Sequence, residues 1–296
     1  MTQLEGRDAE QLPQEREAPK PVSPKWDTVL VLGGGGMKGI AHVGVIKALE
    51  EASIRPDAIV GTSIGGLIGA LLAGGLGWRE MTEVALRLKK EDIVTVNRRA
   101  MWLGGVRAAS VFLDTPFRQW LDNVLPTDRF EELMTPLRIN STSLVTGKEV
   151  WFGNGHNDEI SLLDAVYASC ALPVFFPPAR IAGDYLVDGG VINALPLSEA
   201  EAWGANKIIG VDVGADFVAP REGMFEQGMI AIHERVLNLS IRNQRVQSLD
   251  RYRHLPFLYI RPKIGHLHTF DFDRNQFFME EGYRAAQEAI ARWKGV

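Results

Sequence analysis

The chain has 296 residues, 46% of them hydrophobic, and a formal net charge of −5 at pH 7. This length allows one large buried core, and the alternation of apolar strands with helical stretches favours a single α/β domain over two small ones. The negative charge argues against a nucleic-acid-binding protein, because no basic cluster is concentrated enough to offset phosphate repulsion. We therefore expect no nucleic-acid partner, and any contact with a membrane should be apolar.

The N-terminal residues differ in composition from the rest of the chain. Residues 1–25 are rich in Glu, Gln, Pro, Arg and Lys and are predicted to be a disordered tail, followed by one domain over residues 26–296. The tail contains no apolar signal core. The single Cys170 cannot form an intrachain disulfide, which fits a reducing compartment, so we expect a cytoplasmic protein, with peripheral membrane contact left open.

The first elements alternate strand, helix, strand, helix. A buried strand is predicted over 28–32, a glycine-rich loop over 33–39, a helix over about 40–51, a strand over 57–60 and a helix after Ser63. This order implies parallel strands whose carboxyl ends share one edge of the sheet. The glycine loop and Ser63 should therefore lie together at that edge.

The rest of the chain continues the pattern. Helices are predicted over 78–91, 162–169, 226–245 and 275–294, a hairpin over 136–152, and strands over 185–187, 207–213 and 257–261. Residues 100–125 are crowded with large apolar groups, which is compatible with a lid or acyl-chain wall and equally with ordinary helical packing. The predicted fold class is a three-layer α/β/α architecture with a mostly parallel central sheet.

The segment Gly61-Thr62-Ser63-Ile64-Gly65 has the layout of a nucleophile elbow. A sharp turn from strand to helix pushes the serine hydroxyl out of the sheet, and the two flanking glycines supply the space for that turn. The helix that follows directs free N–H groups at the reaction centre. A Gly-x-Ser-x-Gly pattern would arise by chance in roughly one such chain in ten, so it needs support from its context.

The glycine loop allows three interpretations. As Gly34-x-Gly36-x-x-Gly39 it matches a dinucleotide fingerprint, but that site needs an acid at the end of the second strand, where this chain has the elbow. A phosphate-binding loop needs Gly-Lys followed by Ser or Thr, whereas Lys38 lies between Met37 and Gly39. The third interpretation is a row of backbone N–H groups that faces the elbow and holds a negatively charged oxygen.

Three motifs in order resemble the patatin-like phospholipase family: Gly34-Gly35-Gly36-Met37-Lys38-Gly39, the elbow, and Asp188-Gly189-Gly190. The segment Ala168-Ser169-Cys170-Ala171-Leu172-Pro173 extends the likeness, which spans about residues 29–213. The family more often has Arg at the position of Lys38. The resemblance implies a patatin-like fold and a serine-aspartate dyad that hydrolyses lipid esters without a metal or another cofactor.

Carried over to this chain, the resemblance makes Ser63 the nucleophile and Asp188 the base, and it assigns the oxyanion hole to the backbone N–H groups of Gly34, Gly35 and Gly36. Asp188 should be partly desolvated, because a carboxylate with a pKa of about 4 is a weak base for a hydroxyl in water. The implied substrates are phospholipid, lysophospholipid or neutral lipid esters. The motif is supported by Lys38, Gly39, Gly61, Gly65, Gly189 and Gly190.

Alternatives remain at this stage. A Ser-His-Asp carboxylesterase would use a histidine after the acid, and four follow it: His233, His254, His266 and His268. Asp212 also ends a predicted strand and ranks second to Asp188 as the base. His42 and Cys170 are interpreted as packing residues. A non-catalytic lipid-binding protein and a nucleotide-binding protein are further possibilities.

Overall fold

The computed structural model describes residues 25–99, 102, 108–219, 223–224, 226, 228–252 and 257–293. The predicted N-terminal tail, apart from Lys25, lies outside the described residues, as does part of the apolar stretch 100–125.

The centre of the described chain is an eight-stranded sheet in the order β5-β6-β3-β2-β1-β7-β8, with β4 paired to β3. The five strands from β3 to β8 in this order are mutually parallel, whereas β4, β5 and β6 pair in the antiparallel sense. The strands are β1 (Trp26–Leu32), β2 (Ala58–Thr62), β3 (Leu137–Ser143), β4 (Glu149–Phe152), β5 (Ala179–Ile181), β6 (Asp184–Asp188), β7 (Ala205–Val211) and β8 (Phe257–Ile260).

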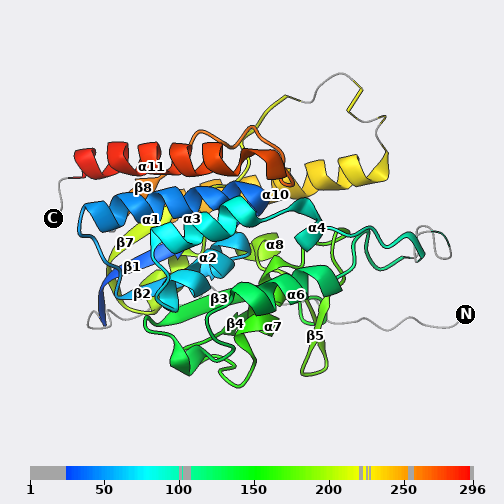
Figure 1. Cartoon of the computed structure of the whole chain (residues 1–296), viewed down its shortest axis with the longest axis horizontal. Coiled ribbons are helices and arrows are strands. Elements are labelled where there is room, and N and C mark those ends of the chain that lie inside the picture. Colours follow the sequence, from blue (N-terminus) through cyan, green and yellow to red (C-terminus); the bar gives the residue numbers. More distant parts are fainter. Residues whose placement is uncertain are drawn as a thin grey trace, which may run out of the picture.

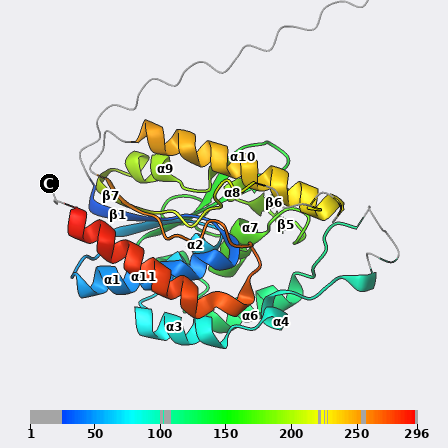
Figure 2. The ribbon, with the colours of Figure 1, turned by 90° about the horizontal axis from the view of Figure 1, so that it is seen from above.

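Helices cover both faces of this sheet. Figure 2 shows α9 and α10 on one face and α1, α3 and α11 on the other, so the chain forms three layers, and Figure 1 shows α11 lying along α1. The helices are α1 (Ala41–Glu51), α2 (Ile64–Ala73), α3 (Trp78–Arg87), α4 (Lys90–Ile93), α6 (Thr115–Val124), α7 (Leu162–Cys170), α8 (Gly190–Asn193), α9 (Leu197–Ala202), α10 (Met229–Arg251) and α11 (Asn275–Arg292), with 3-10 turns η1 (Gly36–Ile40), η3 (Phe130–Glu132) and η5 (Phe272–Arg274).

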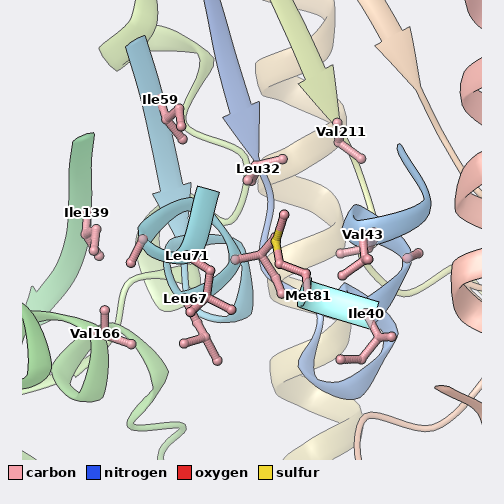
Figure 3. Close-up of a cluster of buried hydrophobic side chains, with 14 of the residues drawn as sticks. Leu32, Ile40, Val43, Ile59, Leu67, Leu71, Met81, Ile139, Val166 and Val211 are labelled. Carbon is pink, nitrogen blue, oxygen red and sulfur yellow. The ribbon is translucent and has the colours of Figure 1, made fainter. Parts of the chain in front are cut away.

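The core has two parts because strand side chains alternate between the faces of the sheet. Leu30 and Leu32 of β1 are fully buried in the larger cluster, under α1, α2 and α7, and Figure 3 shows Leu32 among the apolar side chains of that cluster. Val29 and Val31 are equally buried on the opposite face, in the cluster that contains residues of α9. Both faces of the parallel strands are therefore apolar, as the sequence pattern predicts.

The predicted three-layer α/β/α fold with a mostly parallel sheet is confirmed. Most long elements lie within a few residues of their predicted bounds, but α10 continues to Arg251 where the prediction ends at 245, and α6 is not predicted as a defined helix. Two further kinds of difference occur. The helix predicted over 78–91 ends at Arg87, because Leu88 has an extended backbone conformation, and a new turn, α4, begins at Lys90. The short elements β5, α8 and α9 have no counterpart in the prediction, because three to six residues are too few to show a periodicity.

Candidate active site

Ser63 stands between β2 and α2 in a backbone conformation that is rare for a residue with a side chain, with φ of 54° and ψ of −128°. Such a conformation is strained and is typical of functional turns. The flanking glycines permit the turn: a Cβ on Gly61 would lie 2.5 Å from the Cα of Gly66, and one on Gly65 would overlap the backbone of Leu32. The geometry is that of a nucleophile elbow.

The hydroxyl of Ser63 donates a hydrogen bond of 2.6 Å to Oδ2 of Asp188. Strand β3 explains how two residues so distant in sequence meet. The pairing of β2 with β3 ends at Asn140, and the pairing of β6 with β3 begins at the next residue, Ser141, which is opposite Asp188. The ends of β2 and β6 therefore lie at neighbouring residues of β3, and no histidine intervenes between the hydroxyl and the carboxylate.

The carboxylate of Asp188 is buried, with 5% of the residue exposed. Burial raises its pKa from 3.8 to about 6, although the Ser63 hydroxyl and the N–H of Gly190, which donates to Oδ1 at 2.7 Å, act in the opposite direction. A carboxylate with a raised pKa is a stronger base than an exposed one. The carboxylate of Asp188 is therefore desolvated, as expected for a base that takes a proton from a serine hydroxyl.

The C-terminal end of α7 holds both members of the pair by their backbones. The fully buried hydroxyl of Ser169 accepts the N–H of Ser63 at 2.7 Å, and the carbonyl of Ala171 accepts the N–H of Asp188 at 3.0 Å. Ser169 was part of the family resemblance, but nothing in the sequence assigned it this contact. Because the two bonds start two residues apart on one segment, α7 fixes the relative position of the nucleophile and the acid.

The glycine loop offers fewer free donors than the motif suggests. The N–H of Gly34 donates to the carbonyl of Ala194 at 2.9 Å, and the N–H of Met37 donates to the carbonyl of Thr269 at 2.8 Å. The N–H groups of Gly35 and Gly36, between them, have no acceptor within the part of the chain that the structure describes. These two groups remain as candidates for holding an oxyanion. Gly36 has a φ of +60°, a conformation that favours glycine.

The remaining motif residues surround this loop. Gly39 packs against the side chain of Ile64 so closely that a Cβ would overlap it, and a Cβ on Gly189 would overlap the side chain of Asn140. Lys38 is almost fully buried, and this burial lowers the pKa of its ammonium group to about 8, although Asp212 and Asp216 act in the opposite direction. No carboxylate of the described residues lies within ion-pair distance of Lys38.

The pair of Ser63 and Asp188 lies in a pocket with a mainly apolar lining. Phe117, from the stretch 100–125, is one of its walls, so the described part of that stretch contributes to the pocket. The inner side of α10 forms another wall through Leu237 and Ile241, which the sequence pattern did not single out. Other apolar lining residues are Ile93, Leu172, Phe176, Phe270 and Phe272.

The rival residues have other partners or positions. His42 is fully buried, its Nε2 lies 2.9 Å from the carbonyl of Gly33, and burial lowers its pKa to about 4, so the ring is neutral. His254 lies outside the described residues, and none of the described histidines lines the pocket. Cys170 lines the pocket, but burial raises the pKa of its thiol well above the usual value, so it is not a thiolate nucleophile.

Asp212 is held in a network of its own. The hydroxyl of Tyr259 donates to its Oδ2 at 2.6 Å, and the guanidinium of Arg261 donates to the same oxygen. Arg245 lies beside it, with 3.1 Å between Nε and Oδ2. The N–H of Gly214 donates to its other oxygen, Oδ1, at 2.9 Å, and Asp212 does not line the pocket that contains Ser63, so the geometry favours Asp188 as the base. Within the described residues, no group of three or more His, Cys, Asp and Glu side chains could hold a metal ion.

Comparisons with known proteins show which family the chain resembles. The profile of the family described as Patatin-like phospholipase matches residues 30–201. Patatin-like phospholipase domain-containing protein 7 of Rattus norvegicus is 30% identical over 286 residues, which are 89% of this chain and 20% of that protein. Lysophospholipase NTE1 of Coccidioides immitis (strain RS) is 31% identical over 296 residues, which cover 90% of this chain and 18% of that protein.

The chain therefore spans about a fifth of the length of these curated relatives. Among solved structures, VipD from Legionella pneumophila superposes with a TM-score of 0.52 at 15% sequence identity, over 91% of this chain and 67% of that one. At this identity the likeness shows a shared fold.

Proposed function

Because the chain belongs to the patatin-like phospholipase family, we propose that it hydrolyses carboxylic esters of lipids with Ser63 as nucleophile and Asp188 as base. The observation that carries the proposal is the 2.6 Å hydrogen bond from the Ser63 hydroxyl to a desolvated carboxylate within an apolar pocket. The relatives named as phospholipase and lysophospholipase support phospholipids and lysophospholipids as the substrate class.

The reaction follows from the positions of these groups. Asp188 takes the hydroxyl proton as Oγ of Ser63 attacks the ester carbonyl. In this proposal the oxyanion that forms accepts the N–H groups of Gly35 and Gly36, which line the same pocket as Ser63. Asp188 then gives the proton to the leaving alcohol, which leaves an acyl group on Ser63. A water molecule, deprotonated by the same carboxylate, releases the fatty acid in the second half of the reaction.

The substrate class also bears on location. In this proposal the apolar pocket binds the acyl chain of the substrate, and the protein meets that substrate at a membrane surface. The proposed compartment is the cytoplasm, because the single Cys170 is a free thiol, as is usual in a reducing compartment. None of the described helices is long and apolar enough to cross a membrane. The proposal includes peripheral contact of the protein with the lipid surface.

Ester hydrolysis and active-site labelling test the proposal together. Wild type should hydrolyse a p-nitrophenyl ester and take up a fluorophosphonate on Ser63, located by mass spectrometry, whereas Ser63→Ala and Asp188→Asn should remain folded and inactive. Matched controls are Ser198→Ala and Asp184→Asn, the latter at the other end of β6. If the label falls elsewhere, or if Ser63→Ala keeps the wild-type rate, the proposal is wrong.

A further inference from the structure

Helix α10 presents apolar side chains on two opposite sides of its N-terminal half. The inner side faces the active-site pocket, which Leu237 and Ile241 line. The outer side carries Met229, Ile232 and Val236, which are 71%, 43% and 61% exposed. Their spacing of three and four residues places them on one stripe of the helix. A helix needs only one apolar side to pack on its own protein, so the outer stripe is left without a function in the described fold.

The stripe lies at the active-site edge of the molecule. Figure 1 shows the N-terminal part of α10, in yellow, reaching beyond the N-terminal end of α11. Helix α10 also contacts α8, which begins at Gly190, two residues after Asp188. Because the inner side of the same turns lines the pocket that contains Ser63, whatever covers the stripe also lies beside that pocket.

Positive charge accompanies the stripe on one flank. Arg235 and Arg242 are seven residues apart, so they lie on the same side of α10, two turns from each other. Their guanidinium groups lie 5.3 Å and 5.7 Å from the ring centroid of Phe217. Phe217 is 59% exposed, and its neighbour Val218 is 43% exposed. Apolar side chains bordered by arginines are typical of a helix that lies in the interface of a membrane, where the guanidinium groups meet phosphates.

We propose that the outer stripe of α10, with Phe217, Arg235 and Arg242, docks this protein on the surface of an anionic phospholipid bilayer. The inference rests on the proposed function, because a lipid ester must leave a bilayer to reach Ser63. The arginine flank favours anionic lipid over a second copy of the chain as the occupant. Docking by this face would hold α10, one wall of the pocket, against the lipid surface.

Binding to vesicles in the Ser63→Ala background tests docking separately from hydrolysis. In sedimentation with vesicles of phosphatidylcholine and phosphatidylglycerol, the combined substitutions Met229→Ser, Ile232→Ser and Val236→Ser should weaken binding about tenfold or more. The control is Met134→Ser, which removes a side chain that is 79% exposed in the loop before β3, at the opposite edge of the sheet. Its binding should match that of the parent.

Charge and catalysis provide two further readouts. The pair Arg235→Gln and Arg242→Gln should abolish the preference for vesicles with phosphatidylglycerol over vesicles of phosphatidylcholine alone. In the chain with an intact Ser63, the triple serine variant should keep its rate on a soluble p-nitrophenyl ester and its thermal unfolding temperature, and should lose rate on vesicle-borne phospholipid by the factor lost in binding.

The proposal would be overturned if the triple variant bound vesicles as tightly as the parent, or if sedimentation velocity showed a parent dimer that the triple variant converts to a monomer. Failure of the proposed function has a different signature. In that case the intact chain would hydrolyse neither the soluble ester nor the phospholipid, while the Ser63→Ala protein would still bind anionic vesicles through α10.

Discussion

Replacing Asp188 with asparagine should stabilise the fold while it abolishes the reaction. The amide has the shape of the carboxylate: its oxygen can still accept the N–H of Gly190, and its NH₂ can donate to the hydroxyl of Ser63. It carries no charge that burial would penalise. The wild-type carboxylate does, because burial raises its pKa from 3.8 to about 6.

The size of the effect depends on pH. Since the pKa of Asp188 is higher in the folded state than in the unfolded state, the folded protein binds this proton more tightly, and the wild type loses stability as pH rises from below 3.8 to above 6. The cost of the buried charge is then about 1–2 kcal/mol at about pH 5 and about 3 kcal/mol at about pH 8. Asparagine avoids this cost, so its advantage should grow over the same interval.

Urea unfolding of the wild type and Asp188→Asn at these two pH values measures the difference in free energy of unfolding. The variant should be more stable at both, with the larger gain at the higher pH. Asp184→Asn, on the same strand, serves as a control and should show no comparable change with pH. A variant no more stable than wild type at the higher pH, or a gain that is the same at both, would refute the argument that burial of this charge is costly.

Three further outcomes follow from the site. The kcat/KM for a soluble ester should rise with pH to a plateau and be half-maximal near pH 6, where Asp188 ionises, and a midpoint near that of a free aspartate would contradict this assignment. Gly36→Ala should lower kcat about a hundredfold through the displaced N–H, whereas Gly147→Ala, also at positive φ but with open space around it, should leave the ester assay unchanged. Ser169→Ala leaves the N–H of Ser63 buried without an acceptor, which should lower the free energy of unfolding in urea by about 1–3 kcal/mol. The same substitution should lower kcat more than it raises KM. An unchanged kcat would show that this contact does not position Ser63.

The sequence predicts the long elements well because their signals are local. The run Thr28–Leu32 is apolar and is followed at once by glycines, and β1 ends at Leu32 as that pattern indicates. The end of α3 is harder, because Leu88-Lys89-Lys90 are good helix formers and the chain nevertheless turns at Leu88. Packing against the rest of the fold decides such a boundary, and no local pattern records it.

In the candidate site, too, local sequence patterns identify some residues, whereas the contacts of others depend on tertiary packing. Ser63 and Asp188 can be selected as candidates from their motifs, because the sharp turn of an elbow needs glycines beside the proposed nucleophile. The donors of the glycine loop cannot be separated in this way: Gly34, Gly35 and Gly36 are equivalent in sequence, and only the packing of the loop after α8 commits the N–H of Gly34 to Ala194. The part played by Ser169 is hidden for a similar reason, since its partner lies 106 residues away.

A comparison of the two candidate bases, Asp188 and Asp212, shows why the glycines of the Asp-Gly-Gly motif matter. Asp188 and Asp212 lie at the ends of β6 and β7, and both are almost fully buried. The carboxylate of Asp212 is paired with Arg245 and Arg261 and accepts the hydroxyl of Tyr259, whereas no cation of the described residues pairs with Asp188. The glycine at position 190 matters here because a Cβ would stand 2.9 Å from Oδ1, the oxygen that its N–H binds. The motif thus allows a backbone donor to hold the carboxylate in place of a charged side chain, and the raised pKa of a carboxylate held in this way fits the proposed role of Asp188 as the base that takes a proton from Ser63.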